Sequence, residues 1–308
     1  MLANFLEKSK PINFVTYLGF FFVFFLLEIY TLFFLDSFLW KGVVASIVFF
    51  CFFSAIFFFV NFILTKNKLT FDNTFAYFLF TLFIIVFIRA ILSYQSLLCV
   101  LLYFLFLRKI YSLQKDSKLI QKLFDAGLWL GVLLFFQPKS ILFLILIYTA
   151  VLVYNRITIQ TILIPLTGLF VPLFLGTTYF FYVDKPIALF HVFSKIHFHV
   201  AYFKTIENGW FIPFVLLLSS LAFLLKTPKA MAVSNTFRKS WVLININFFI
   251  ALAIGLISNE SDQLPIVFLL FPAAIVVANG LELILKKTIQ SVIFAIIIVC
   301  VVFGKFYF

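Results

Sequence analysis

The chain has 308 residues, of which 65% are hydrophobic and only 11% are charged, and its formal net charge is +12. A typical soluble domain carries about 25% charged residues, so this composition excludes a soluble protein. Apolar runs close to the length that crosses a bilayer, about 20 residues, recur from end to end. The sequence therefore predicts a polytopic membrane protein, an all-α transmembrane helical bundle.

Polar and proline residues divide the apolar runs into eleven predicted helices. These helices cover residues 14–35, 43–65, 73–92, 94–108, 123–136, 140–155, 160–182, 210–225, 241–257, 264–285 and 288–304. We expect one integral membrane domain over residues 1–308. Within it, residues 1–182 form a helical core, residues 183–209 a segment on the outer surface, and residues 210–308 the C-terminal helices.

Residues 125–156 predict a short helical hairpin with a Gln-Pro-Lys-Ser turn at residues 137–140. The first apolar run, residues 126–136, is shorter than a membrane crossing, and the second is only a little longer. Lys139 in the turn is therefore expected within or just below the outer lipid headgroups. A lysine at that depth needs an anionic partner or a wet cavity, which makes it a candidate functional residue.

The basic residues predict the orientation of the chain in the membrane. With a cytoplasmic N-terminus, sixteen of the 23 Lys and Arg residues fall in inner loops and seven fall outside. Because inner loops are normally the more basic, this bias predicts an odd number of crossings and a periplasmic C-terminus. The cations are spread over many short loops instead of forming one stripe, so the net charge needs no nucleic-acid partner.

The segment 183–209 alternates apolar and charged residues and contains all three histidines. Its apolar residues recur at steps of three and four, which predicts a short amphipathic helix lying on the outer membrane surface. His191, His197 and His199 resemble a metal cluster only superficially, because His197 and His199 point away from each other on a helix. A strand would align those two, but we interpret the histidines as interfacial packing residues and predict no metal site.

Three further residues are candidates for chemistry at the outer face. Glu28 and Asp36 lie near the outer end of the first helix, eight residues apart and therefore on nearly the same side. Either Asp36 is a loop residue and Glu28 pairs with a neighbouring helix, or the two supply a catalytic base or a metal ligand. Arg89, near the outer end of the third helix, either reaches the headgroups or binds a phosphate.

Other features of the apolar runs predict no chemistry. Asn245, Asn247, Asn279 and Glu282 are expected to make hydrogen bonds between helices. The chain contains 50 phenylalanines, which we interpret partly as the codon bias of an AT-rich genome and as lipid-facing filler instead of a substrate-binding stripe. The three cysteines lack the spacing of metal or redox motifs and are expected to be small buried hydrophobes.

The order of these features, over roughly residues 14–210, resembles the GT-C superfamily of polytopic glycosyltransferases. Those enzymes take sugars from polyprenyl-phosphate donors at the outer membrane face. The similar features are an acidic residue after the first helix, a glycine-bearing helix that ends in a proline-lysine turn, and a following helix that contains prolines. The residues are Asp36, Gly127, Gly131, Pro138, Lys139, Pro165 and Pro172.

The chain departs from that superfamily in its first outer loop, which has about seven residues and one Asp where a larger loop with paired acids is usual. It also has no soluble C-terminal domain such as many GT-C enzymes carry. The chain equally resembles an uncharacterised family of small bacterial inner-membrane proteins, which predicts its location in the bacterial inner membrane.

The GT-C resemblance implies transfer of a polyprenyl-linked sugar at the outer face. Asp36 and Glu28 would be the catalytic residues, and Arg89 and Lys139 would hold the lipid phosphate. A divalent cation is a cofactor that the resemblance allows, and the implied partners are membrane lipids, a polyprenyl-phosphate sugar and other envelope membrane proteins. Two other classes stay open: a non-catalytic subunit or assembly factor of a bacterial envelope complex, and a transporter.

Overall fold

Helices make up nearly all of the structure, a computed structural model that describes residues 2–7, 11–33, 40–115, 117–183, 209–232, 234–258 and 264–307. Within these ranges the chain forms α-helices and two short 3-10 helices, with no strand. Nine of the described helices are long and apolar enough to cross a membrane, and two shorter apolar helices accompany them. The predicted all-α transmembrane bundle is confirmed.

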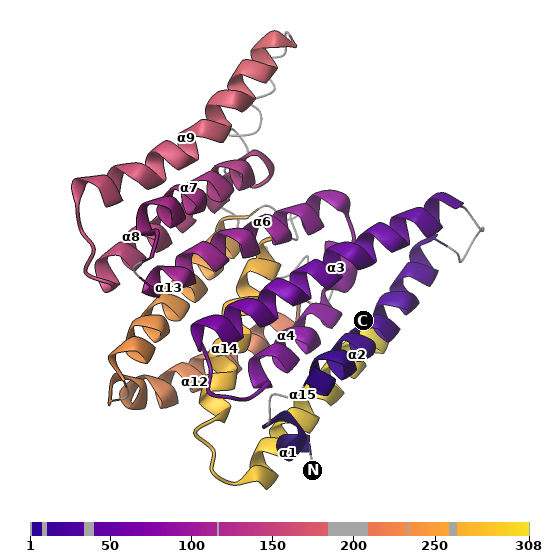
Figure 1. Cartoon of the computed structure of the whole chain (residues 1–308). Helices are drawn as coiled ribbons and strands as arrows, with labels where there is room; N and C mark the ends of the chain where they lie inside the picture. Colours follow the sequence, from indigo (N-terminus) through magenta and orange to yellow (C-terminus); the bar gives the residue numbers. More distant parts are fainter. Residues whose placement is uncertain are drawn as a thin grey trace.

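Most of the described helices follow one another through short connections (Figure 1). The first part of the chain contains α1 (Leu2–Leu6), α2 (Pro11–Phe33), α3 (Trp40–Asn67), α4 (Phe75–Val86), α5 (Ile88–Ile91), α6 (Tyr94–Tyr111) and the 3-10 helix η1 (Ser112–Gln114). The second part contains α7 (Leu119–Phe136), the 3-10 helix η2 (Pro138–Leu142), α8 (Phe143–Val153), α9 (Ile159–Tyr182), α12 (Phe211–Ala232), α13 (Asn235–Ile257), α14 (Leu264–Leu281) and α15 (Lys287–Tyr307).

All eleven predicted helices are present, although several of their ends differ. The third predicted helix is the pair α4 and α5, and the sixth is η2 followed by α8. α13 begins well before the predicted residue 241, because the side chain of Ser234 accepts a hydrogen bond from the N–H of Phe237 and caps the helix start. The amphipathic helix predicted on the outer surface lies mostly in residues 184–208, outside the described residues.

The first and last long helices run in the same direction (Figure 1). Near their starting ends, Lys287 of α15 forms an ion pair of 2.6 Å with Glu7. Towards their other ends, Lys305 of α15 forms an ion pair with Glu28 of α2. The described part of the chain therefore starts near one end of the α2 and α15 pair and finishes near the other. We call the end at Glu7 and Lys287 the basic end, and the opposite one the far end.

α14 is the central helix of the bundle, and every one of its residues is buried. Its sequence is apolar all round, which is typical of a helix surrounded by protein. α4, α12 and α13 pack around it. Gly280 allows the close approach of α12, because a Cβ added there would lie 2.5 Å from the Cβ of Ala222.

Phenylalanine side chains fill much of the space between the helices. Phe21, Phe57, Phe80 and Phe104 are fully buried, and the rings of Phe80 and Phe104 meet edge to face at 5.8 Å. Others, such as Phe174, are exposed on the outside of the bundle. The prediction that the phenylalanines are lipid-facing filler is therefore wrong for the buried set, because these rings provide the packing between helices.

The cysteines are likewise divided between core and surface. Cys99 is buried as predicted, whereas Cys51 is exposed and Cys300 is half-buried. The expectation of three buried cysteines is thus wrong for Cys51, because it lies on the same exposed side of α3 as Val44, Ile47 and Phe58.

The predicted hairpin consists of α7, η2 and α8. α7 begins at Leu119, before the start of the apolar run, and it is therefore long enough to cross a membrane. Its closest neighbour is α9, and glycines form the contact on both sides. Cβ atoms added at Gly127 or Gly168 would collide with the main chain of the opposite helix. The glycines allow the two backbones to touch, as small residues do between membrane helices.

The contact of α7 with α9 predicts unequal effects of two Gly→Ala substitutions. A Cβ at Gly131 would lie 2.6 Å from the carbonyl oxygen of Leu169 and 2.9 Å from Pro172, so G131A should destabilise the fold by about 1–3 kcal/mol. Gly19 of α2 has nothing within 4 Å of an added Cβ, so G19A should leave stability unchanged or raise it slightly. Thermal unfolding in detergent compares the two, and equal melting temperatures would contradict the proposed packing.

Candidate functional site

The predicted outer-face residues that the structure describes, Glu28, Arg89 and Lys139, come from three separate elements, α2, α5 and η2. Glu28 is buried in α2 and forms its ion pair with Lys305 of α15. This ion pair agrees with the interpretation in which Glu28 pairs with a neighbouring helix. Asp36, the other carboxylate, lies outside the described residues, as do His191, His197 and His199.

The two predicted phosphate-binding cations differ in exposure. Arg89 is exposed in the short helix α5, whereas Lys139 is buried in η2, which packs against α7 and α13. Both residues make interactions with other parts of the protein. Arg89, Lys139 and Glu28 line neither of the two hollows described below.

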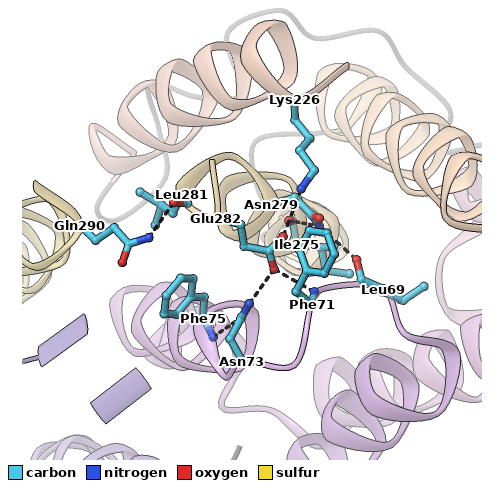
Figure 2. Close-up of polar contacts among 10 residues, drawn as sticks. All are labelled: Leu69, Phe71, Asn73, Phe75, Lys226, Ile275, Asn279, Leu281, Glu282 and Gln290. Carbon is cyan, nitrogen blue, oxygen red and sulfur yellow. Dashed lines mark hydrogen bonds and ion pairs between the residues drawn. The ribbon is translucent and has the colours of Figure 1, made fainter. Parts of the chain in front are cut away.

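A buried ion pair stands at the basic end of α14 (Figure 2). Lys226 of α12 contacts Glu282, the residue after α14, at 3.1 Å, and both side chains are almost inaccessible to solvent. The other carboxylate oxygen of Glu282 accepts hydrogen bonds from the backbone N–H of Phe71 at 2.9 Å and from the amide of Asn73 at 2.7 Å. One carboxylate therefore joins α12, α14 and the loop between α3 and α4.

Aromatic and amide groups complete this arrangement. The Lys226 ammonium lies 4.8 Å from the ring centre of Phe71 and 5.2 Å from that of Phe237, a distance at which the ring faces attract a cation. Asn279 of α14 donates to the carbonyl oxygen of Leu69 at 3.1 Å (Figure 2). The loop of residues 68–74 is thus held against α14 at three points, Leu69, Phe71 and Asn73.

The polar residues predicted to join helices mostly do so. Asn247 accepts a hydrogen bond from Tyr103 of α6, and Glu282 and Asn279 make the contacts just described, so the prediction is confirmed for these three. It is wrong for Asn245, whose amide donates to the carbonyl of Trp241 in its own helix.

A cavity of about 970 Å³ lies beside this network, between the basic-end halves of α2 and α3, and we call it the large cavity. Most of its described lining is aromatic or uncharged polar, and its charged residues are Lys68 and Asp72. The wall includes Phe71, which also contacts Lys226. The buried ion pair therefore supports one side of the cavity.

The hydroxyl group of Tyr77 is the chemically notable group in the wall of the large cavity. It is buried and has no hydrogen-bond partner within the described protein, whereas the hydroxyl of Tyr17 beside it bonds Thr74 at 2.8 Å. A buried hydroxyl without a partner costs free energy, about 1–3 kcal/mol. Because the hydroxyl itself is inaccessible to solvent, a group bound in the cavity could become its partner once the wall side chains shift to admit it.

A second hollow, of about 460 Å³, adjoins the first and shares Asn67 with it. It lies between the ends of α3 and α6, η1 and the start of α7, and its described lining is mainly basic. Among the described residues, no group of three or more His, Cys, Asp or Glu side chains is arranged to hold a metal ion. The large cavity thus offers mainly aromatic and uncharged polar groups, and the second hollow offers cations.

Two sequence features could have indicated this site. Lys226 directly follows a predicted membrane helix, residues 210–225, that contains no charged residue. The stretch of residues 65–74 is rich in polar residues, and it forms much of the cavity wall. Which residues meet there depends on how α2, α3, α12 and α14 pack, which no local pattern encodes.

The long apolar helices around a fully buried central helix define a multi-pass α-helical membrane protein. Over residues 1–308 the chain matches the family described as "Family of unknown function (DUF6427)", and it belongs to that family. No curated protein and no solved structure matches it.

The buried ion pair predicts that the effect of replacing Lys226 depends strongly on whether Glu282 still carries its charge. Lys226→Met should destabilise the fold by about 3–5 kcal/mol, because it leaves the Glu282 carboxylate buried without a cation. The double variant Lys226→Met/Glu282→Gln should be more stable than Lys226→Met alone, because no uncompensated charge remains. Chemical or thermal unfolding of the purified protein measures both.

The control for this experiment is Lys287→Met, which breaks the exposed ion pair with Glu7. Exposed pairs contribute little to stability, so this variant should unfold close to the wild type. A Lys226→Met variant that is as stable as Lys287→Met would mean that the Lys226–Glu282 pair does not stabilise the fold.

Proposed function

We propose that the protein is a membrane-embedded binding subunit whose large cavity takes the polar head group of an amphiphile, with a lipid-linked sugar as the class of ligand that fits best. The observation that carries this proposal is the cavity of about 970 Å³ with the unpartnered Tyr77 hydroxyl in its wall. Ligand sites typically combine such a volume with aromatic walls and a few well-placed polar groups.

The lining favours an uncharged, hydroxyl-rich head group. Asn61, Thr70 and Ser240 offer amide and hydroxyl groups that both donate and accept, as sugar hydroxyls require. The ring of Phe71, which is 55% exposed, provides a flat apolar surface, against which the C–H face of a sugar ring can stack. Because the described charges of the lining are one cation and one carboxylate, the cavity suits the uncharged sugar, and the phosphate of a lipid-linked sugar would stay at its rim.

The position of the cavity favours a ligand with a hydrocarbon chain. Val15 of α2 lines the cavity and is 65% exposed, although it lies in a segment long and apolar enough to cross a membrane. An exposed apolar residue of such a helix faces lipid. The rim of the cavity therefore reaches the lipid-facing surface, where a chain could stay in the bilayer while the head group enters.

A binding role is favoured over catalysis by the ion pairs of three of the five described carboxylates. Glu28, Asp125 and Glu282 each form an ion pair with a lysine, and two of these pairs join helices that are distant in the sequence. A carboxylate held in this way is poorly available as a general base. This supports the class of non-catalytic subunit or assembly factor of a bacterial envelope complex. The positive-inside rule puts the basic end on the cytoplasmic side of the inner membrane.

The Tyr77 hydroxyl provides a test that separates binding from folding. Tyr77→Phe should leave stability unchanged or raise it, because the hydroxyl has no partner in the protein, and should weaken ligand binding about two- to tenfold. The ligand is a polyprenyl-phosphate hexose in detergent, compared with the same polyprenyl phosphate without the sugar. Native mass spectrometry measures binding, and thermal unfolding measures stability.

Tyr103→Phe is the matched control, because the Tyr103 hydroxyl is also buried but donates to Asn247 at 3.0 Å and to the carbonyl of Phe268 at 3.1 Å. It should lower stability and leave binding unchanged. If the sugar-free lipid binds as well as the hexose lipid, the sugar is not recognised. If Tyr77→Phe binds the hexose lipid and the sugar-free lipid as tightly as the wild type does, the large cavity is not the binding site for the sugar.

A glycosyltransferase of the GT-C type is the second candidate, and it concerns the far end. Its support is the exposure of Arg89 there, where a guanidinium could bind a lipid phosphate through two parallel hydrogen bonds. In this proposal Asp36 is the base or holds a divalent cation, since Glu28 is paired with Lys305, and Lys139 assists at the phosphate.

The glycosyltransferase candidate predicts two different phenotypes. Asp36→Asn should abolish sugar transfer yet keep lipid binding, whereas Arg89→Ala should weaken lipid binding itself. Envelope glycan analysis of cells that carry each variant, with native mass spectrometry of the purified proteins, distinguishes them. Unchanged glycans and unchanged lipid retention in both variants would exclude the enzyme and leave the binding subunit.

A further inference from the structure

The second hollow at the basic end carries an inference that is independent of the function proposed above. Its volume is about 460 Å³, and the described residues that line it include six cations and one carboxylate. We call it the basic pocket. Its charged lining residues are Lys66, Arg108, Lys109, Lys115, Lys118, Lys122 and Asp125. Even with Asp116, which lies outside the described residues, the cations here outnumber the carboxylates.

Most of these cations are oriented without being neutralised. Lys109 donates to the Asp125 carboxylate at 2.6 Å, and this is the pocket's one ion pair among the described residues. The Lys122 ammonium instead donates to the carbonyl oxygens of Ser112 at 2.8 Å and Lys115 at 2.9 Å. Carbonyl groups fix the direction of an ammonium but leave its full charge in place.

Two further cations share one aromatic ring. The Lys66 ammonium lies 4.6 Å from the ring centre of Phe62, and the Arg108 guanidinium carbon lies 5.0 Å from the same centre. The ring attracts each cation, but the two like charges repel each other. An anion beside them would be attracted to both and would offset this repulsion.

The start of α7 adds further positive potential to the basic pocket. α7 has no acidic residue in its first turn, and the residue before it, Lys118, makes no capping hydrogen bond through its side chain. Cations at the start of a helix are unfavourable, because the helix dipole is positive there. A bound anion would be attracted to the N–H groups of this first turn and would compensate Lys118 and Lys122 together.

We propose that the basic pocket binds a phosphate group, carried either by a membrane lipid or by a small soluble molecule. Guanidinium and ammonium groups around one hollow are the donors that phosphate oxygens prefer. Three segments that are long and apolar enough to cross a membrane, Trp40–Asn67, Tyr94–Gln114 and Leu119–Phe136, begin or end at this pocket. That puts it at the level of the headgroups, where basic pockets between helices bind anionic lipids.

To test this proposal, the purified full chain is offered phosphate from two sources. Nanodiscs of zwitterionic lipid with added phosphatidylglycerol supply a headgroup phosphate, and pyrophosphate added to purely zwitterionic nanodiscs supplies a free one. The wild type should bind at least one of them, by native mass spectrometry for the lipid and by calorimetry for pyrophosphate. Lys66→Gln/Arg108→Gln should weaken that binding about tenfold or more.

A matched control and a second pocket variant make the result decisive. Arg238→Gln/Lys286→Gln removes the same charge from exposed positions at the basic end that do not line the pocket, and it should change binding less than about twofold. Lys115→Gln/Lys118→Gln alters exposed loop positions of the pocket, so it should weaken binding without disturbing the fold. The proposal is overturned if the wild type binds neither phosphate source, if the control loses as much affinity as the pocket variants, or if both pocket variants bind normally.

Discussion

The ion pair between Lys226 and Glu282 is the interaction on which the basic end of the bundle depends. α14 is wholly buried, so a carboxylate directly after it has no water to solvate its charge and must find its partners within the protein. The lysine comes from α12, and further hydrogen bonds come from Phe71 and Asn73 in the loop after α3. The loop is therefore held where it forms a wall of the large cavity, and the cavity exists partly because a buried charge had to be satisfied.

The two hollows at this end differ in chemistry although they share Asn67. The large cavity is lined by tyrosine rings, amides and hydroxyls with nearly balanced charge, whereas the basic pocket is strongly positive. A neutral polar group bound in the large cavity and a phosphate group bound in the basic pocket would thus lie a short distance apart at the same membrane level. At the far end, by contrast, the described charged pair Glu28 and Lys305 joins two helices and lines neither hollow.

The residues behind the resemblance to GT-C glycosyltransferases have a structural explanation of their own. Gly127 and Gly131 allow the backbone of α7 to touch α9, where Pro165 and Leu169 lie opposite them. Glycines in both helices are therefore what this close contact requires, whatever reaction the protein takes part in. The family to which the chain belongs is defined over its whole length, and its description assigns no reaction that would select among the proposed functions.

The sequence by itself determined that the chain is a bundle of membrane-spanning helices, and it predicted all eleven apolar segments. It could do so because a bilayer requires long apolar runs with internally satisfied backbone hydrogen bonds, and that requirement is local. The lengths of α7 and α13 were less predictable, because polar residues such as those after Ser234 continue a helix once its first turn is capped.

Only the tertiary structure decided which polar residues meet. Lys226 and Glu282 are far apart in the chain, as are Glu28 and Lys305, and nothing in their neighbouring residues indicates these partners. The same holds for Tyr77, whose hydroxyl lacks a partner only because of the way α2, α3 and α4 enclose it. Hydrophobic periodicity reports which side of a helix is apolar, whereas the pairing of buried charges and the shape of a cavity depend on how all the helices pack together.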